Sequence, residues 1–209
     1  MPRTTKIRIT KDPAERKREL IHAAQHLFLT KGYEHTAVSD IVKAVNVAQG
    51  TFYYHFKSKA DLLEAVVEKI NSALEQDMRS IVNQDNTDAA IQLNALINQL
   101  LNMRKANRDL LKVIHKPSNA ALHQKLMVLL SSMMVSFLES VISAGVNQRR
   151  FNAPYPREAA LALMGSLDYL LHVPETEPDP QRSERVRVTI EHLLARVLGI
   201  NGYTFNLEL

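Results

Sequence analysis

The 209-residue sequence contains no cysteine and no tryptophan. Without cysteine the chain can form no disulfide and can offer no thiolate to a metal, so an intracellular setting is the natural expectation. The first residues, MPRTTKIRITK, lack the apolar segment of a signal peptide. The longest uncharged apolar stretch, Leu126 to Leu138, has 13 residues, three of them serines, and is too short to span a membrane. We therefore expect a cytoplasmic protein that does not enter a membrane.

Familiar catalytic motifs are also missing. The sequence has no G-x-S-x-G nucleophile elbow, no glycine-rich phosphate loop and no H-E-x-x-H zinc helix. Glu191 and His192 are adjacent on an expected helix, so their side chains diverge by about 100° and cannot cooperate directly. His22 and His26 have the spacing of a helical chelate, but no third ligand is visible nearby and two solvated histidines are the simpler interpretation. We expect neither an enzyme, nor a cofactor, nor a bound metal.

Positive charge is concentrated near the N-terminus. Residues 1–60 contain 11 Lys or Arg and 5 Asp or Glu, whereas the remaining residues contain 15 basic and 17 acidic side chains. A basic N-terminal module on a near-neutral body is typical of nucleic-acid binding. Residues 1–11 carry four basic residues and no acid. They are expected to be either a solvated tail or an arm that follows DNA phosphates.

Hydrophobic periodicity predicts an all-α protein of about nine helices. Asp12-Pro13 followed by Glu15 marks the start of the first helix, and Lys31-Gly32 marks its end. Thr36 and Asn107 are expected to cap the second and sixth helices with their side chains. After the first, helices are expected over residues 38–45, 49–55, 61–82, 88–104, 109–115, 119–146, 157–173 and 181–198.

These elements divide the chain into four expected parts. Residues 1–11 form the basic flexible arm, and residues 12–58 form a three-helix domain. Residues 59–198 form a larger helical domain, and residues 199–209 form a short apolar tail whose packing site the sequence does not indicate.

The stretch from Thr36 to Lys59 predicts two short helices around a tight turn. Val38, Ile41, Val42 and Val45 are spaced i, i+3, i+4, i+7, which is one helical face. Asn46 then lies where the chain must turn sharply, and asparagine tolerates the left-handed backbone conformation. The next helix, residues 49–55, carries polar, small and aromatic residues. Two helices joined in this way form a helix-turn-helix, whose second helix enters a DNA major groove.

Several side chains of this second helix suit DNA. Gln49 can pair with an adenine or another base edge, and Gly50 lets the backbone approach a phosphate. Tyrosine and threonine hydroxyls reach phosphates or bases, and lysines add cations beside the duplex. The alternative is an aromatic-rich hairpin that packs internally around Phe52 and Phe56. The predicted DNA-binding residues are Thr36, Gln49, Gly50, Thr51, Tyr53, Tyr54, His55, Lys57 and Lys59.

Residues 14–66 resemble the DNA-binding domain of the tetracycline-repressor (TetR) family of bacterial regulators. Two positions depart from the family pattern. Asn46 stands where the family often has glycine, and Ala48 stands where many members have a Ser or Thr cap. Because alanine cannot cap, we expect the start of the next helix to be less stable by about 1 kcal/mol. The resemblance rests on Ile21-His22-Ala23-Ala24, Leu27-Phe28, Lys31-Gly32-Tyr33, Thr36, Asp40-Ile41, Val47, the run from Gly50 to Lys59, and Leu62-Leu63.

The resemblance implies a homodimer in which the last two helices pair with their twofold mates. An isolated DNA-binding unit would read too short a site to be selective, which also favours a dimer. The alternative is that these helices only close the core of one chain. The predicted dimer residues are Leu163, Leu167, Leu170, Ile190, Leu194 and Val197.

A small-molecule pocket is expected in the larger domain. Methionine suits a pocket that adapts to bulky apolar ligands, although a Met and Leu stripe is also typical of plain core. In the resembled family the long helix after the DNA-binding domain transmits ligand binding to the spacing of the two DNA-binding units. The candidate pocket residues are Met103, Leu111, His115, Met127, Leu130, Met134 and Phe137.

Together these expectations describe a ligand-responsive, homodimeric, DNA-binding transcriptional regulator. More specifically, we expect a repressor released from a palindromic operator in double-stranded DNA by a small apolar effector, whose identity the sequence does not indicate. The alternative is an inducer-independent DNA-binding protein of the same fold that acts in chromosome organisation or on a protein partner. Release of DNA by a ligand would distinguish the two.

Overall fold

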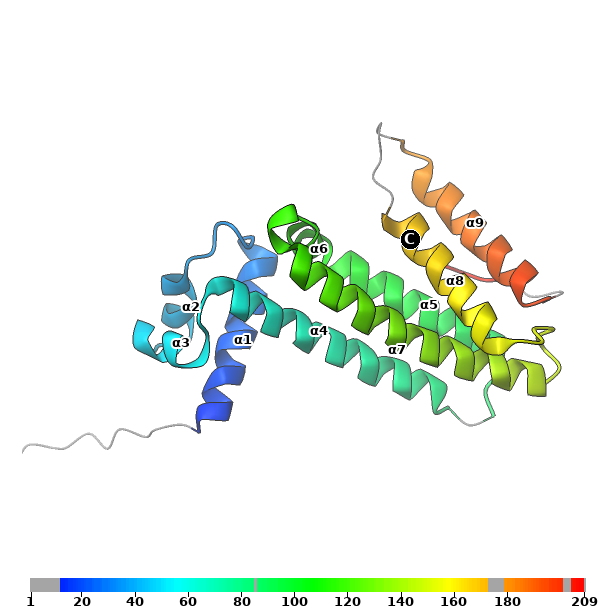
Figure 1. Ribbon diagram of the computed structural model, residues 1–209, viewed down its shortest axis with the longest axis horizontal. Coiled ribbons are helices and arrows are strands. Elements are labelled where there is room, and N and C mark those ends of the chain that lie inside the picture. The colour runs from blue at the N-terminus through cyan, green and yellow to red at the C-terminus, as the bar shows by residue number, and fades with distance from the viewer. Residues whose placement is uncertain (1–11, 85, 173–178, 201–203, 209) are drawn as a thin grey trace, which may run out of the picture. The chain divides into compact units, whose positions relative to one another are not determined.

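The computed structural model describes residues 12–84, 86–172, 179–200 and 204–208. Over these residues the chain forms nine α-helices and one short 3-10 helix, with no strand (Figure 1). The all-α architecture expected from the sequence is therefore confirmed. The expected basic arm, residues 1–11, lies outside the described residues. The chain divides into two compact units, residues 1–70 and 71–209.

The first unit contains α1 (Pro13–Thr30), α2 (Val38–Ala44), α3 (Gln49–His55) and the beginning of α4 (Lys59–Val82). The Asp12 carboxylate accepts from the backbone N–H of Ala14, as expected of an N-cap. Asn46 has a φ of 52°, so the sharp turn before α3 uses the left-handed backbone conformation predicted for it. The largest fully buried side chains of this unit are Leu20, Phe28, Ile41, Phe52, Leu62 and Leu63.

The predicted Thr36 cap of α2 is wrong. Thr36 is only 1% exposed, so its hydroxyl needs a partner inside the unit, and it donates to the carbonyl of Gly32 at 2.7 Å. The helix instead begins after Ala37, whose N–H donates to the Asp40 carboxylate at 3.0 Å. The Thr36 hydroxyl therefore stabilises the loop that follows α1. The Asp40 carboxylate accepts the backbone hydrogen bond at the start of α2.

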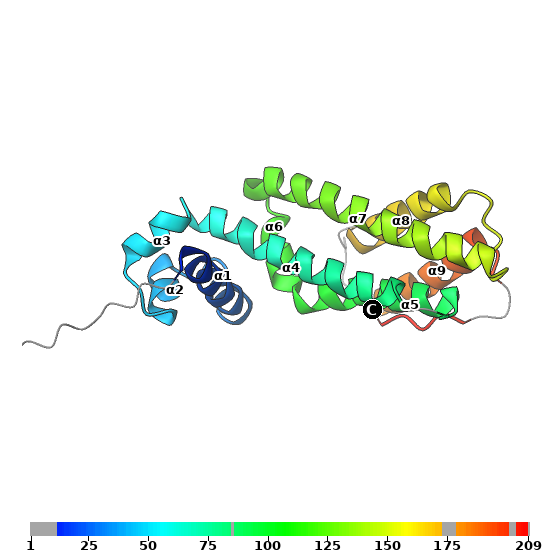
Figure 2. The same cartoon turned by 90° about the horizontal axis from the view of Figure 1, so that it is seen from below.

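The second unit contains the rest of α4, then α5 (Ala89–Ala106), α6 (Arg108–Ile114), the 3-10 helix η1 (Pro117–Asn119), α7 (Ala120–Asn147), α8 (Pro156–His172) and α9 (Arg182–Val197). α7 packs along α5 and α8, and α9 packs on α8, in both views (Figures 1 and 2). One hydrophobic core joins these helices.

Asn107 is the N-cap residue of α6, as predicted, but its side chain makes no capping hydrogen bond there. Asn107 lies between α5 and α6 and is 9% exposed. Its side-chain amide donates backwards to the carbonyl of Met103 at 2.8 Å. The buried amide thus satisfies a carbonyl at the end of α5, where the last carbonyls of a helix lack intrahelical partners.

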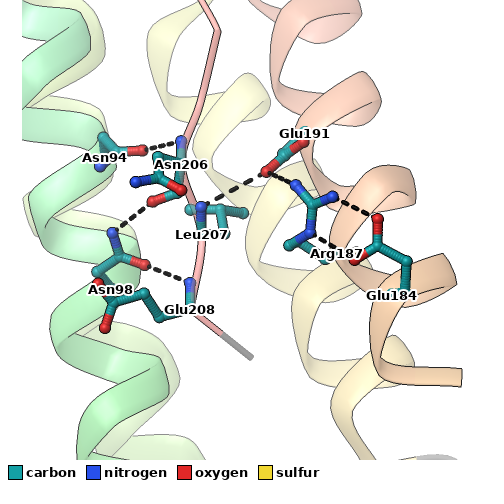
Figure 3. Close-up of polar contacts among 8 residues, drawn as sticks. All are labelled: Asn94, Asn98, Glu184, Arg187, Glu191, Asn206, Leu207 and Glu208. Atoms are coloured by element: carbon teal, nitrogen blue, oxygen red, sulfur yellow. Dashed lines mark hydrogen bonds and ion pairs between the residues drawn. The ribbon is translucent and has the colours of Figure 1, made fainter. Parts of the chain in front are cut away.

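Residues 204–208 of the apolar tail pack on the second unit (Figure 3). Phe205 and Leu207 are each 3% exposed and belong to the core. Between α5 and α9 the tail backbone is held by side-chain amides: Asn206 donates its N–H to Asn94 Oδ1 at 2.8 Å, and its carbonyl accepts from Asn98 Nδ2 at 2.7 Å. The tail thus closes one edge of the core.

The helical stretch Pro117–Asn147 has the length and apolar composition of a membrane span, with a mean hydropathy of 1.8 over 18 residues. Core helices of soluble proteins meet the same criterion. Here α7 contacts α5, α6 and α8 within the second unit, and Met134, Leu138 and Ile142 are fully buried there. Burial accounts for part of the apolar composition of α7: 39% of the apolar window is buried, whereas Val128 and Leu129 are 64% and 51% exposed.

Candidate nucleic-acid interface

Helix α3 has one anchored side and one exposed side. Phe52 and Phe56 are 0% and 2% exposed, and their ring centroids lie 5.8 Å apart in the core of the first unit. Tyr53 and Tyr54, in contrast, are 55% and 75% exposed. The Tyr53 ring lies edge-on to Phe52 and the Tyr54 ring lies edge-on to His55, yet more than half of each tyrosine stays exposed. This exposure argues against the internally packed hairpin and leaves much of both rings available to another molecule.

Most of the predicted DNA-binding residues lie on or beside this exposed side. Gln49, Gly50 and Lys57 are exposed, and Thr51 and His55 are half-buried. A Cβ atom added to Gly50 would meet no other atom within 4 Å, and Gly50 has no positive φ. Neither internal packing nor backbone conformation therefore requires glycine at this position of α3.

Thr36 and Lys59 are set apart from this group. Thr36 is buried, with its hydroxyl used inside the unit. The Lys59 ammonium donates to the carbonyls of Tyr33 and Thr36 at 3.0 and 3.2 Å, and it lies 4.3 Å from the centroid of the Tyr33 ring. Both side chains hold the loop between α1 and α2, a role that sequence spacing alone does not reveal.

Basic residues of α1 lie close to the end of α3. The Lys17 ammonium is 5.5 Å from the centroid of the Phe56 ring. Partial burial, followed by the charges of Lys17 and Arg16, lowers the pKa of His55, so this imidazole is neutral near pH 7. Lys17 was not among the predicted site residues, although its place in the basic run Arg16-Lys17-Arg18 was a signal for it.

An open groove of about 720 Å³ lies between α1 and the turn before α3. His22 and His26 line it, and both are exposed. No group of three or more potential metal ligands occurs within the described ranges, these histidines included. The groove is therefore a feature of the surface beside α3, with Arg16 and Asn46 at its edges.

The seven candidate pocket residues do not form one pocket. Leu111, His115 and Met127 line an open cleft of about 700 Å³, and Leu130 lines a second hollow of about 530 Å³ between α7 and α8. The others pack in or against the core: Met134 is 0% exposed, and Met103 and Phe137 are partly buried. The larger cleft also has charged side chains in its walls, which were not predicted from the sequence because they come from four separate helices.

The predicted dimer residues face inward in the single chain. Leu163, Leu167, Ile190 and Leu194 are at most 2% exposed in the core, and the partly buried Leu170 and Val197 pack against it. Four of the six residues therefore close the core of their own chain, and Leu170 and Val197 are the ones that stay partly exposed. The outer side of α8 instead exposes Leu161, Ala162, Gly165 and Tyr169.

A helix-turn-helix unit with an exposed second helix, followed by a larger all-helical unit, defines the class of helix-turn-helix regulators. Two family models match the chain. Residues 20–66 match the bacterial regulatory proteins of the tetR family, and residues 102–173 match the tetracyclin repressor-like C-terminal domain. The chain belongs to the TetR family of DNA-binding transcriptional regulators.

Curated relatives are similar over part of their length. The regulator TtgR of Pseudomonas putida is 29% identical over 97 residues, which is 46% of each chain. The regulator TcmR of Streptomyces glaucescens is 42% identical over 71 residues, covering 34% of this chain and 29% of TcmR. The matched region thus spans about half or less of these relatives. Both relatives are transcriptional regulators.

Solved structures share the fold over most of the chain. A transcriptional regulator from Cytophaga hutchinsonii superposes with a TM-score of 0.71 at 20% identity, covering 87% of this chain and 96% of that one. A TetR/AcrR-family regulator from Thermobifida fusca superposes with a TM-score of 0.62 at 23% identity, covering 90% and 98%. These similarities show a common fold over most of the chain.

Proposed function

We propose that the chain acts as a homodimer that binds a palindromic operator through its two α3 helices. The observation that carries this proposal is the exposure of Tyr53 and Tyr54 on a short helix anchored by Phe52 and Phe56. A helix of seven residues is about 10 Å long and fits a major groove about 12 Å wide. One such helix reads only a few base pairs, so selectivity requires a second copy.

Each exposed residue of α3 has a proposed role. Gln49 lies at the N-terminus of the helix, where side chains of recognition helices contact base edges. Tyr53 and Tyr54 offer hydroxyls to phosphates or bases, and Gly50 allows close approach of the duplex. Lys57 and Lys17 supply cations near the phosphate backbone. Thr36 and Lys59 hold the loop that supports this surface and contribute to binding indirectly.

We propose that residues 12–58 are the DNA-binding domain and residues 59–198 the regulatory and dimerisation domain, with α4 connecting them. The outer side of α8, with Leu161 and Tyr169, is the proposed contact with the second copy. A ligand in the larger domain would alter the spacing of the two α3 helices and release DNA, which makes the protein a repressor. Such coupling between sites is typically worth about 1–3 kcal/mol. The protein would act in the cytoplasm, where the DNA is.

The cleft of about 700 Å³ in the second unit favours this ligand-responsive function over the inducer-independent alternative, because that volume suits a small molecule.

The experiment that tests DNA recognition compares two exposed tyrosines. Tyr54 is 75% exposed on α3, and Tyr155 is 70% exposed before α8. We expect Tyr54→Ala to lower affinity for a selected operator at least about tenfold, the loss of roughly one good contact, and Tyr155→Ala to leave it unchanged. Equal effects of the two changes would contradict the proposed interface.

A further inference from the structure

The cleft in the second unit is unusually rich in positive charge. Segments α5, α6, α7, α8 and α9 all contribute to its walls. Its lining includes five cationic side chains and one carboxylate, that of Asp168. Leu101, Leu111, Met127 and Leu171 add apolar surface. Lys112 already pairs with Asp109 at 2.8 Å, but a small apolar effector, as expected from the methionines, would bring no negative charge to a cleft with this excess of cations. The five cations are Arg104, Lys105, Arg108, Lys112 and Arg182.

Arg104 shows most clearly this excess of positive over negative charge in the cleft. One guanidinium nitrogen lies 3.1 Å from Nε2 of His172, and another donates to the carbonyl of Leu171 at 3.1 Å. Both of these partners are uncharged groups. Burial lowers the pKa of Arg104, yet a guanidinium stays protonated in proteins. The Asp168 carboxylate acts on Arg104 electrostatically, but both hydrogen-bond partners of the guanidinium are neutral. A partly buried cation of this kind gains most from an anion that reaches its remaining N–H groups.

Three histidines stand next to this guanidinium. Nδ1 of His172 lies 2.8 Å from the Asp168 carboxylate, so it carries the proton and leaves Nε2 to accept from Arg104. The His115 ring lies edge-on to two others, 5.1 Å from His172 and 4.7 Å from His123. Nε2 of His123 is buried without a hydrogen-bond partner. An acceptor atom of a ligand in the cleft would accept a hydrogen bond from Nε2 of His123 when this nitrogen carries the proton.

We propose that this cleft binds an organic anion, with its charged group beside Arg104 and the three histidines and its apolar part on Leu111 and Met127. The inference rests on the proposed function, since it names the class of effector. A metal ion fits less well, because the Arg104 cation already occupies the free nitrogen of His172. Correspondingly, no set of three metal ligands is found among the described residues. The anionic group is a carboxylate or a phosphate, two forms that the guanidinium binds alike.

The test is calorimetric titration of the full chain, without DNA, using three matched probes. They are 2-naphthoate, 2-naphthyl phosphate and the neutral 2-naphthamide. We expect at least one anion to bind about tenfold or more tighter than the amide, as a charge-assisted hydrogen bond predicts. The tighter anion identifies the charged group. An amide that binds as tightly as both anions would overturn the proposal, and so would the absence of binding by any probe.

Variants locate the site. Arg104→Gln should weaken the anion about tenfold and leave the amide unchanged. Because Arg104 also supports Leu171 and His172, the exposed Arg108→Gln serves as a second variant and should weaken the anion about threefold. Arg196→Gln, exposed on α9 outside the cleft lining, is the matched control and should change nothing. Equal affinities in all three variants would overturn the assignment.

Two further results separate this inference from the proposed function. Zinc that binds the chain and displaces the naphthoate would show a metal site and overturn the anion site. Naphthoate that binds in the cleft but leaves operator affinity unchanged would confirm the anion site while removing its role as the effector site. Failure of every probe would leave the DNA-binding proposal intact, because the titration contains no DNA.

Discussion

The tail offers the sharpest test of packing in the second unit. Phe205 is 3% exposed and packs in the core, although it lies four residues from the end of the chain. Replacing a buried phenylalanine by alanine typically costs about 3–5 kcal/mol. We therefore expect Phe205→Ala to lower the free energy of unfolding by about 3 kcal/mol or more. That is a large part of the 5–15 kcal/mol typical of a protein domain.

The polar contacts of the tail should matter less. Asn98 donates to the Asn206 carbonyl and accepts from the N–H of Glu208 at 3.0 Å, and both bonds are exposed (Figure 3). A net hydrogen bond contributes about 0.5–1.5 kcal/mol, so Asn98→Ala should cost about 1–2 kcal/mol. Tail packing therefore depends more on the buried ring than on the asparagine contacts.

The assay is urea unfolding followed by far-ultraviolet circular dichroism, because the chain has no tryptophan to report by fluorescence. Glu208→Ala is the control, since Glu208 is exposed and uses its backbone N–H for the contact with Asn98; its effect should stay within about 0.5 kcal/mol. A Phe205→Ala variant within about 1 kcal/mol of the parent chain would refute the packing of the tail in the core.

Three other outcomes are expected. Gly145→Ala places a Cβ against the ring of Phe151 and should lower the free energy of unfolding, measured by urea titration, by about 2–3 kcal/mol. Gly165→Ala is the control and should not lower it, because a Cβ at Gly165 meets no other atom within 4 Å. Equal effects of the two changes would contradict the packing of Phe151 against Gly145. Gly50→Ala should raise the free energy of unfolding, measured by urea titration, by about 0.5–1 kcal/mol. The same change should weaken operator binding, measured by fluorescence anisotropy. Unchanged binding would remove Gly50 from the interface. Burial, then the neighbouring cationic groups, lowers the pKa of His115 to about 4, so protonating it destabilises the fold as pH falls from about 6.5 towards that value. A bound anion opposes this shift, so naphthoate should bind more tightly at about pH 5.5 than at pH 7.5, and pH-independent affinity in calorimetry would contradict this coupling.

Helix positions were predictable because local signals agree with the fold. Residues 49–55 were predicted and observed as a helix, and the left-handed Asn46 before it followed from the chemistry of asparagine. The absence of a side-chain cap at Ala48 is likewise observed. Hydrophobic periodicity and turn residues determine local structure through neighbours a few positions apart, so these signals can be identified directly in the sequence.

Roles that depend on tertiary contacts were not predictable in the same way. Thr36 and Asn107 have the chemistry of helix caps, but burial directs their side chains to carbonyls of a preceding segment. The apolar stripes of α8 and α9 were identified, yet periodicity does not tell whether a stripe faces its own chain or a partner. The charged cleft combines single residues from helices far apart in sequence, and no linear pattern reports that combination.

The most direct test of operator recognition is selection of binding sites from random duplexes with the purified chain, followed by salt titration of the best site. We expect a twofold-symmetric motif whose half-sites lie about one helical turn or a multiple of it apart. Affinity should fall steeply with salt, by a slope near 0.9 for each phosphate neutralised. Loss of that motif in Tyr54→Ala, with the Tyr155→Ala control unchanged, would place recognition on α3. Binding without any motif, or the same motif in both variants, would contradict sequence recognition by this helix.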